Sequence, residues 1–223
     1  MKVYICACQY YHRIPEDKIA AIQTACREAQ IPCEIVPDLC LTSVNNHSKL
    51  TELASDDVIM ACQHRAVRSL FGNVEELNIE GLNCIDLRAA SLDDIMASLS
   101  LKPIQPVEEL IYEKINCEWI PWFPVIDKTR CTECKKCVDF CIFGVYSIEA
   151  GKVKVTQPKS CKTDCPACAR ICPQNAIIFP KSEEERLNGT LNEKIKPQES
   201  DNISLRERLR HRKNNLRLFK EDK

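Results

Sequence analysis

The chain has 223 residues, and its 31 Lys and Arg residues nearly balance its 32 Asp and Glu residues. This length is enough for one or two domains with a buried core, and 44% hydrophobic residues exclude a disordered chain or a protein that coats nucleic acid. No apolar run reaches the roughly 18 residues of a membrane span, and no signal-peptide cleavage site follows the short apolar run at 3–8. We therefore expect a cytoplasmic protein, and since disulfides are rare there, its 16 cysteines point to metal binding.

Strands and helices are predicted to alternate through the first hundred residues. Pro15, Glu16 and Asp17 open a helix whose apolar side chains then recur at helical spacing, and Ser91 is the expected N-cap of a later helix. Strands are expected at 3–7, 33–36, 57–61 and 82–87, with further helices at 47–54, 65–71 and 91–99. This order predicts a small α/β domain over residues 1–100, with a parallel sheet covered on both faces.

A linker and a charged tail are predicted on either side of a cysteine-rich segment. Several prolines indicate a linker over 101–124, with a short helix near 108–115, and Trp119, Trp122 and Phe123 are expected to pack it against the next domain. Residues 181–223 are predicted to form a charged tail, partly helical or disordered, in which 205–220 is basic and helical. A solvated helix and a docking helix for an acidic partner both fit that composition. We expect no nucleic-acid binding, since the tail follows no known module.

The charges and cysteines are unevenly divided along the chain. Residues 1–126 carry 10 basic and 18 acidic side chains, whereas residues 127–180 carry 9 basic and 5 acidic ones. Eight cysteines lie before residue 118 and eight lie between residues 131 and 172. The first module is therefore acidic, and the second is basic before any bound metal is counted.

The second group of cysteines forms two closely spaced runs. The first run is Cys131, Cys134, Cys137 and Cys141, and the second is Cys161, Cys165, Cys168 and Cys172. Such tandem runs indicate two [4Fe–4S] clusters, in which the fourth cysteine of each run, starting a helix, ligates the other cluster. One cluster is then assigned to Cys131, Cys134, Cys137 and Cys172, and the other to Cys161, Cys165, Cys168 and Cys141. A pair of zinc knuckles is the alternative, because Cys-x2-Cys pairs also bind zinc.

This pattern resembles that of the bacterial two-cluster [4Fe–4S] ferredoxins over residues 125–180. The resemblance implies an α+β ferredoxin-like domain, with 125–126 pairing with 177–179 and a hairpin over 145–155. The second run has one extra residue between its first two cysteines. Ile142 stands where the family commonly has Pro, and Lys136 where it commonly has Gly.

Four cysteines of the first module follow the predicted strands. Cys6 and Cys8 follow the first strand, Cys40 the second and Cys62 the third. Because ligands bind at the carboxyl ends of parallel strands, these four thiols are expected to share one crevice, although small buried cysteines are also common in cores. The core is the expected place of the remaining four, which are Cys26, Cys33, Cys84 and Cys117.

Residues 1–90 bear a fainter resemblance to the N-terminal domain of the heterodisulfide reductase A subunit. The resemblance rests on Cys6-Ala7-Cys8, on Cys40, and on Ala61-Cys62 with Arg65, although Gln9 stands where that family has Gly. It implies a third iron–sulfur cluster with Cys6, Cys8, Cys40 and Cys62 as ligands. A zinc site, a thiol–disulfide relay and a docking surface are the alternatives for this crevice.

The sequence contains no catalytic triad, phosphate-binding loop or general-base pair. We therefore interpret the chain as an iron–sulfur electron-transfer protein, either a carrier or an electron-relay subunit of a larger oxidoreductase, with a redox protein as its partner. The alternative is a thiol/disulfide reductase that uses the N-terminal cysteine crevice and is fed by the ferredoxin clusters. A third hypothesis, that the clusters only stabilise the fold, conflicts with the regular eight-cysteine pattern.

Overall fold

The computed structural model describes residues 1–53, 57–73, 81–102 and 110–190. Residues 1–193 form one compact unit. The predicted tail helix at 205–220 lies outside the described residues, and the division into domains at 1–100, 101–124, 125–180 and 181–223 stays a prediction. No helix in the described ranges combines the length and the apolarity that crossing a membrane requires.

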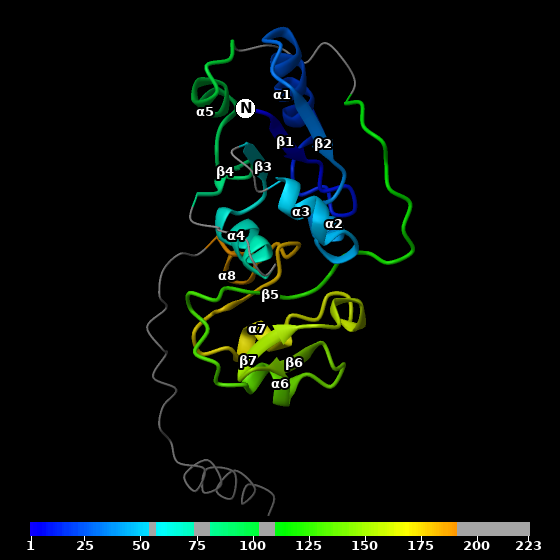
Figure 1. Cartoon of the computed structure of the whole chain (residues 1–223), viewed down its shortest axis with the longest axis vertical. Helices are drawn as coiled ribbons and strands as arrows, with labels where there is room; N and C mark the ends of the chain where they lie inside the picture. Colours follow the sequence, from blue (N-terminus) through cyan, green and yellow to red (C-terminus); the bar gives the residue numbers. More distant parts are fainter. Residues whose placement is uncertain (54–56, 74–80, 103–109, 191–223) are drawn as a thin grey trace, which may run out of the picture. The chain divides into compact units, whose positions relative to one another are not determined.

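A parallel sheet of four strands organises the first hundred residues (Figure 1). Its order is β2-β1-β3-β4, and Val3 of β1 is in register with Cys33 of β2 and Val58 of β3. All side chains of β1 and β3 are buried, so both faces of the sheet are covered, as predicted. The strands are β1 (Val3–Cys6), β2 (Cys33–Val36), β3 (Val58–Ala61) and β4 (Asn83–Asp86).

In the described residues, five helices belong to this α/β part, and four of them match predicted helices. Glu16 and Asp17 lie in the first turn of α1, and Ser91 caps α5 in a capping box with Asp94. Helix α2 is not among the predicted helices, because Pro37 ends the second strand and the residues after it carry only one local helix signal. That signal is Asp38, whose carboxylate accepts a hydrogen bond from the backbone N–H of Leu41. The helices are α1 (Glu16–Glu28), α2 (Leu39–Asn45), α3 (His47–Leu53), α4 (His64–Gly72) and α5 (Leu92–Ser98).

Residues 110–124, a described part of the predicted linker, form no helix, so the expected helix near 108–115 is wrong for 110–115. Two glutamine side chains bind its backbone instead: Gln9 bonds both the N–H and the carbonyl of Ile115, and Gln23 does the same at Ile111. These bonds replace the internal bonds of a helix. Further on, Phe123 is buried in the hydrophobic core of the α/β part, and Trp122 is buried in a second core around the cysteine runs. Both positions agree with the expectation that these side chains pack the linker against its neighbours.

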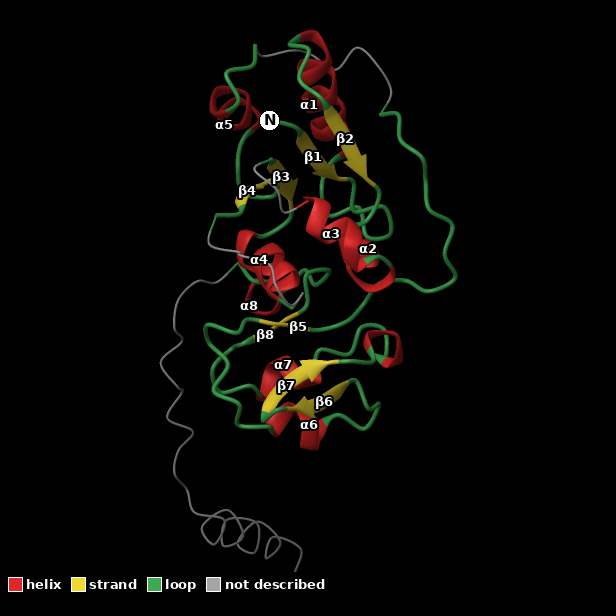
Figure 2. Ribbon diagram, viewed as in Figure 1, coloured by secondary structure: helices red, strands yellow, loops and turns green. Residues whose placement is uncertain are grey.

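Two short antiparallel sheets and small helices follow (Figure 2). The two predicted pairings are confirmed: β5 pairs with β8, and β6 pairs with β7 around a turn at Ala150 and Gly151, which both have positive φ. The elements are β5 (Val125–Ile126), α6 (Lys136–Phe140), β6 (Tyr146–Glu149), β7 (Lys152–Val155), the 3-10 helix η1 (Pro158–Ser160), α7 (Ala167–Ile171), β8 (Ile177–Ile178) and α8 (Glu185–Asn188).

The β5–β8 pair lies between two hydrophobic cores. Val125 and Ile178 belong to the core of the α/β part, whereas Ile126 and Ile177 belong to the core that surrounds the cysteine runs. This division follows from the alternation of side chains along a strand. The cysteine-rich segment is thereby packed directly onto the α/β part.

Candidate metal centres

The first cysteine run contributes to a cavity between α6 and the end of α7. Glu133, within this run, has a φ of 53°, and its carboxylate accepts a 2.6 Å hydrogen bond from the backbone N–H of Val153, so that β7 holds the loop in place. Four cysteines line the cavity, three from the first run and one from the second, namely Cys131, Cys134, Cys137 and Cys172. The four residues predicted for one cluster therefore lie around one space.

A second cavity collects the remaining four cysteines of the motif. Its other walls are largely apolar, and the hydroxyl of Tyr146 donates a 3.0 Å hydrogen bond to the sulfur of Cys168. Burial raises the pKa of Tyr146 well above its ordinary value, so that this hydroxyl keeps its proton. The lining cysteines are Cys141, Cys161, Cys165 and Cys168.

The expectation that the fourth cysteine of each run starts a helix is wrong. Cys141 and Cys172 directly follow α6 and α7, whereas Cys137 and Cys168 lie in the first turns of these helices. The x3 spacing separates the third and the fourth cysteine by about one turn along the helix axis, and the fourth cysteine lines the neighbouring cavity. The backbone N–H of Ala176 then donates a 3.3 Å hydrogen bond to the sulfur of Cys172.

The donors of both cavities fit an iron–sulfur cluster, because each cavity presents four thiols and no carboxylate or imidazole lines it. Burial raises the pKa of Cys137 and of Cys161 to about 12, and that of Cys168 to about 11. These thiols are therefore protonated without a metal and would release protons on binding one. In the described part of the chain, no three His, Cys, Asp or Glu side chains are close enough together to hold a single metal ion, so the fit of the two cavities rests on their cysteine lining.

The four N-terminal cysteines also line one cavity. Cys6 ends β1, Cys8 has a φ of 51°, Cys40 lies in α2, and Cys62 follows β3. The cavity is narrow, with a volume of about 10 Å³, and the first motif cavity is similarly narrow at about 20 Å³. Burial raises the pKa of Cys6 and of Cys40 above their ordinary value.

Lys181 lies in this N-terminal cavity, and the sequence reasoning did not anticipate it. Its ammonium group is 2.6 Å from Oδ2 of Asp38 and 3.3 Å from the sulfur of Cys8. Lys181 and Asp38 are 3% and 0% exposed. No local sequence signal could have found this contact, since 143 residues separate the two partners.

All sixteen cysteines are free thiols. Of the four expected in the core, Cys26 is fully buried on α1, while Cys33 and Cys84 are half-buried and pack against the same core. Cys26 and Cys33 also share a hydrogen bond. Cys117 is half-buried in the extended segment.

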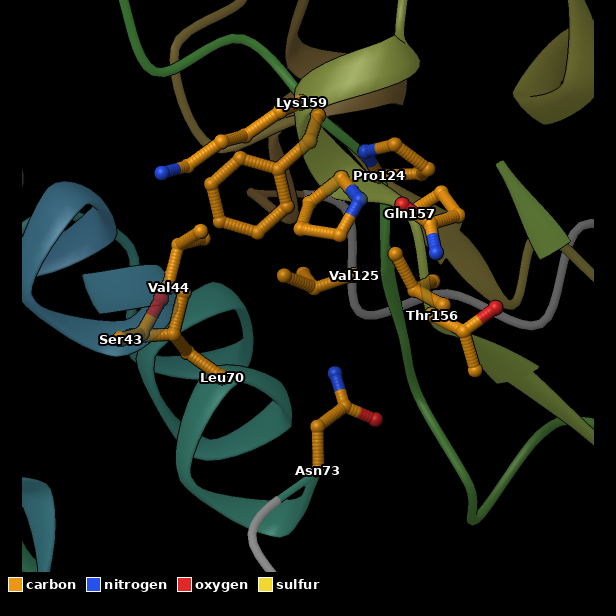
Figure 3. A pocket seen from close by; sticks show the side chains of 12 residues that line it. Ser43, Val44, Leu70, Asn73, Pro124, Val125, Thr156, Gln157 and Lys159 are labelled. Atoms are coloured by element: carbon orange, nitrogen blue, oxygen red, sulfur yellow. The ribbon is translucent and has the colours of Figure 1, made fainter. Parts of the chain in front are cut away.

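A larger cavity lies where α2 and α4 meet β5 and the chain after β7 (Figure 3). The side chains of Ser43, Val44 and Leu70 face those of Val125 and Lys159 across it. No cysteine or histidine is among its lining residues, so it is not a candidate metal centre.

Comparison with known proteins shows which family the chain is similar to. No protein-family model matches the chain. An uncharacterised ferredoxin of Methanocaldococcus jannaschii is 45% identical over 85 residues, 37% of this chain and 58% of that protein, so the chain spans little more than half of that relative. A ferredoxin of Methanothermococcus thermolithotrophicus is 39% identical over 51 residues, 23% of this chain and 83% of that protein. The chain belongs to the ferredoxins.

This ferredoxin also resembles an enzyme subunit. Pyruvate synthase subunit PorD of Methanocaldococcus jannaschii is 31% identical over 85 residues, which cover 35% of this chain and 96% of that protein. The relatives support an iron–sulfur electron-transfer role in an oxidoreductase. They do not show the resemblance of residues 1–90 to the heterodisulfide reductase A subunit, and they do not support the thiol reductase alternative.

Proposed function

We propose that this ferredoxin carries two [4Fe–4S] clusters and acts as an electron-relay subunit of a larger oxidoreductase. One cluster would be held by Cys131, Cys134, Cys137 and Cys172, and the other by Cys161, Cys165, Cys168 and Cys141. The observation that carries the proposal is the sorting of these eight cysteines into two cavities, each of which takes three thiols from one run and one from the other.

When bound, each cluster takes up and releases single electrons. The chain contributes the thiolates, the burial and the hydrogen bonds to sulfur that set the potential. The hydroxyl of Tyr146 and the backbone N–H of Ala176 make such bonds, at Cys168 and Cys172. Lys135 and Lys136 line the first cavity and offset its negative charge.

The role as a relay subunit is supported by the match to nearly the whole length of the pyruvate synthase subunit. The redox partner would reach the second cluster most directly, because Phe140 and Ile142 beside its cavity are 50% and 89% exposed. An exposed apolar surface of this kind is typical of contact sites between proteins.

We also propose a third iron–sulfur cluster in the N-terminal cavity, with Cys6, Cys8, Cys40 and Cys62 as ligands. Its support is the convergence of four thiols from separate elements on one buried space, which has as many lining cysteines as the first motif cavity. Zinc is the competing occupant, because four thiolates also suit that ion.

Metal analysis of the protein purified without oxygen tests these assignments. Two clusters predict about 8 Fe and as much sulfide per chain, and a third raises the count to about 12. Reduced-state EPR spectra should contain signals of [4Fe–4S] clusters. Iron near zero with stoichiometric zinc would refute the two-cluster proposal, and about 8 Fe would refute only the third cluster.

Cysteine variants then test the assignment of the ligands. Cys131→Ala and Cys141→Ala should each lower the iron content by about 4 Fe per chain, because each removes one of the four thiolates of a cluster. Cys131→Ala should lose the first cluster and Cys141→Ala the second. The matched control is Cys117→Ala, which removes a half-buried cysteine outside all three cavities and should leave the iron content unchanged. Loss of the same EPR signal in both ligand variants would contradict the crossed assignment.

A further inference from the structure

We propose that Lys181 is a positioning residue that completes the N-terminal four-cysteine site. Its ammonium group, anchored by Asp38, would bond the sulfur of Cys8 and offset the negative charge of the ligands. The inference rests on the proposed third cluster and adds to it a group that is no metal ligand.

The burial of this lysine needs a reason other than stability. Lys181 and Asp38 are almost without solvent contact, and their ammonium and carboxylate groups are 2.6 Å apart. Taking both charges out of water costs several kcal/mol per ion, and apolar replacements of such pairs are often neutral or stabilising. A requirement of the four-thiol site for a cation would explain why this ion pair is buried beside it.

Asp38 and Arg13 hold Lys181 in a single position. Oδ1 of Asp38 accepts the backbone N–H of Leu41 as the cap of α2, which leaves Oδ2 for the ammonium group. The Nε of Arg13 donates a 2.9 Å hydrogen bond to the carbonyl of Lys181. The lysine can therefore direct a second N–H at the sulfur of Cys8, 3.3 Å away.

The charges of the site show why the cation matters. A [4Fe–4S] cluster with four thiolates carries about −2, and the carboxylate of Asp38 adds another negative charge in the same buried space. Lys181 cancels one of these charges and supplies an N–H···S bond. Without it, either the cluster would be lost or its reduction, which adds an electron, would become harder.

The position of Lys181 in the chain links the two parts of the protein. It follows β8 at a distance of three residues, and 173 residues separate it from Cys8. The segment that carries the eight-cysteine motif therefore supplies the last group of the N-terminal site. That site is complete only when this segment is packed against the sheet.

A double variant removes the N–H···S bond of Lys181 without leaving an unpaired charge in the core. Lys181→Met alone would leave the Asp38 carboxylate buried without its partner, which can unfold the chain. Asp38→Asn with Lys181→Met removes both charges and retains a residue that caps α2 well. Lys181→Arg is the rescue variant, because it keeps a cation at this position. Lys152→Met, at an exposed lysine of β7, is the matched control.

Iron content, sulfide content, EPR spectra and midpoint potentials are measured on each purified full-length protein.

The expected result is about 12 Fe in the wild type, the control and Lys181→Arg. The double variant lacks the N–H bond to the sulfur of Cys8, so it should have about 8 Fe or a lowered potential of the third signal. The double variant should keep the signals of the two motif clusters, which shows that it has folded. A double variant with about 12 Fe and an unchanged third potential would overturn the role of Lys181 and leave the third cluster standing. About 8 Fe in the wild type would overturn the third cluster itself, and with it this inference.

Discussion

A single hydroxyl group contacts a cysteine of the second cavity. The side chains of Tyr146 and Cys168 are both buried, and the 3.0 Å hydrogen bond between them joins the hairpin to the start of α7. Hydrogen bonds to ligand sulfur favour the reduced, more negative state of a cluster. This bond therefore belongs to the groups that set the potential of the second cluster.

Tyr146→Phe should lower the midpoint potential of that cluster and leave the iron content unchanged. A net bond energy of about 1 kcal/mol corresponds to some tens of millivolts, because about 59 mV equals 1.4 kcal/mol in a one-electron couple. EPR-monitored redox titration measures the shift. Tyr112→Phe, at a half-buried tyrosine that packs against the first core, is the control. Equal potentials in both variants would show that the hydroxyl does not act on the cluster.

At the scale of elements, the end of α8 is packed against the start of α4. Gly189 ends α8 with a φ of 94°, and a Cβ atom placed there would lie 3.2 Å from the backbone nitrogen of Ala66 and 3.3 Å from the side chain of Ile178. Both the left-handed conformation and the close approach require glycine. This contact holds α8 near the N-terminal part of α4.

Gly189→Ala should reduce the free energy of unfolding by about 1–2 kcal/mol, which is the cost of holding a residue with a side chain in the left-handed backbone conformation. The close contact of the new Cβ atom with Ala66 should reduce it further. Anaerobic guanidinium titration followed by circular dichroism measures it. Gly81→Ala is the matched control, because a Cβ atom at residue 81 would have no atom of the described residues within 4 Å, and the φ of Gly81 is not positive. A loss at residue 189 no greater than that at residue 81 would contradict this account of the contact.

At the scale of the whole molecule, one buried ion pair joins α4 to the cysteine-rich segment. Nε of Arg65 is 2.7 Å from Oδ2 of Asp127, and the guanidinium also donates to the carbonyl of Asn175. Burial alone would raise the pKa of Asp127, but the bonds from Thr129 and Arg65 outweigh it, so this pKa lies below its ordinary value. Arg65 thus stabilises the charged form of a carboxylate between two cores.

Arg65→Met should cost about 1–3 kcal/mol of stability, because the buried carboxylate of Asp127 then keeps only the bonds from Thr129 and the guanidinium of Arg130, 3.7 Å away. The control is Arg170→Met, whose pair with Glu184 is exposed and should contribute less than about 1 kcal/mol. The same anaerobic titration compares the two variants. If both variants lose a similar, small amount of unfolding free energy, the Arg65–Asp127 pair contributes little to joining the α/β part and the cysteine-rich segment.

The sequence by itself determined most of the elements of the first hundred residues and the eight motif cysteines. Helix caps such as Ser91, the alternation of apolar side chains and the short cysteine spacings act within about ten residues, so these signals can be read locally. Helix α2 and the extended course of 110–115 were missed, because the first depends on one capping carboxylate and the second on distant glutamine side chains.

Only the tertiary structure decided which distant groups meet. It brought Lys181 to Cys8 across 173 residues, and Arg65 to Asp127 across 62. It also divided the side chains of β5 and β8 between two cores. Such contacts follow from the packing of whole elements and from the cost of burying a charge without a partner, which no local spacing records.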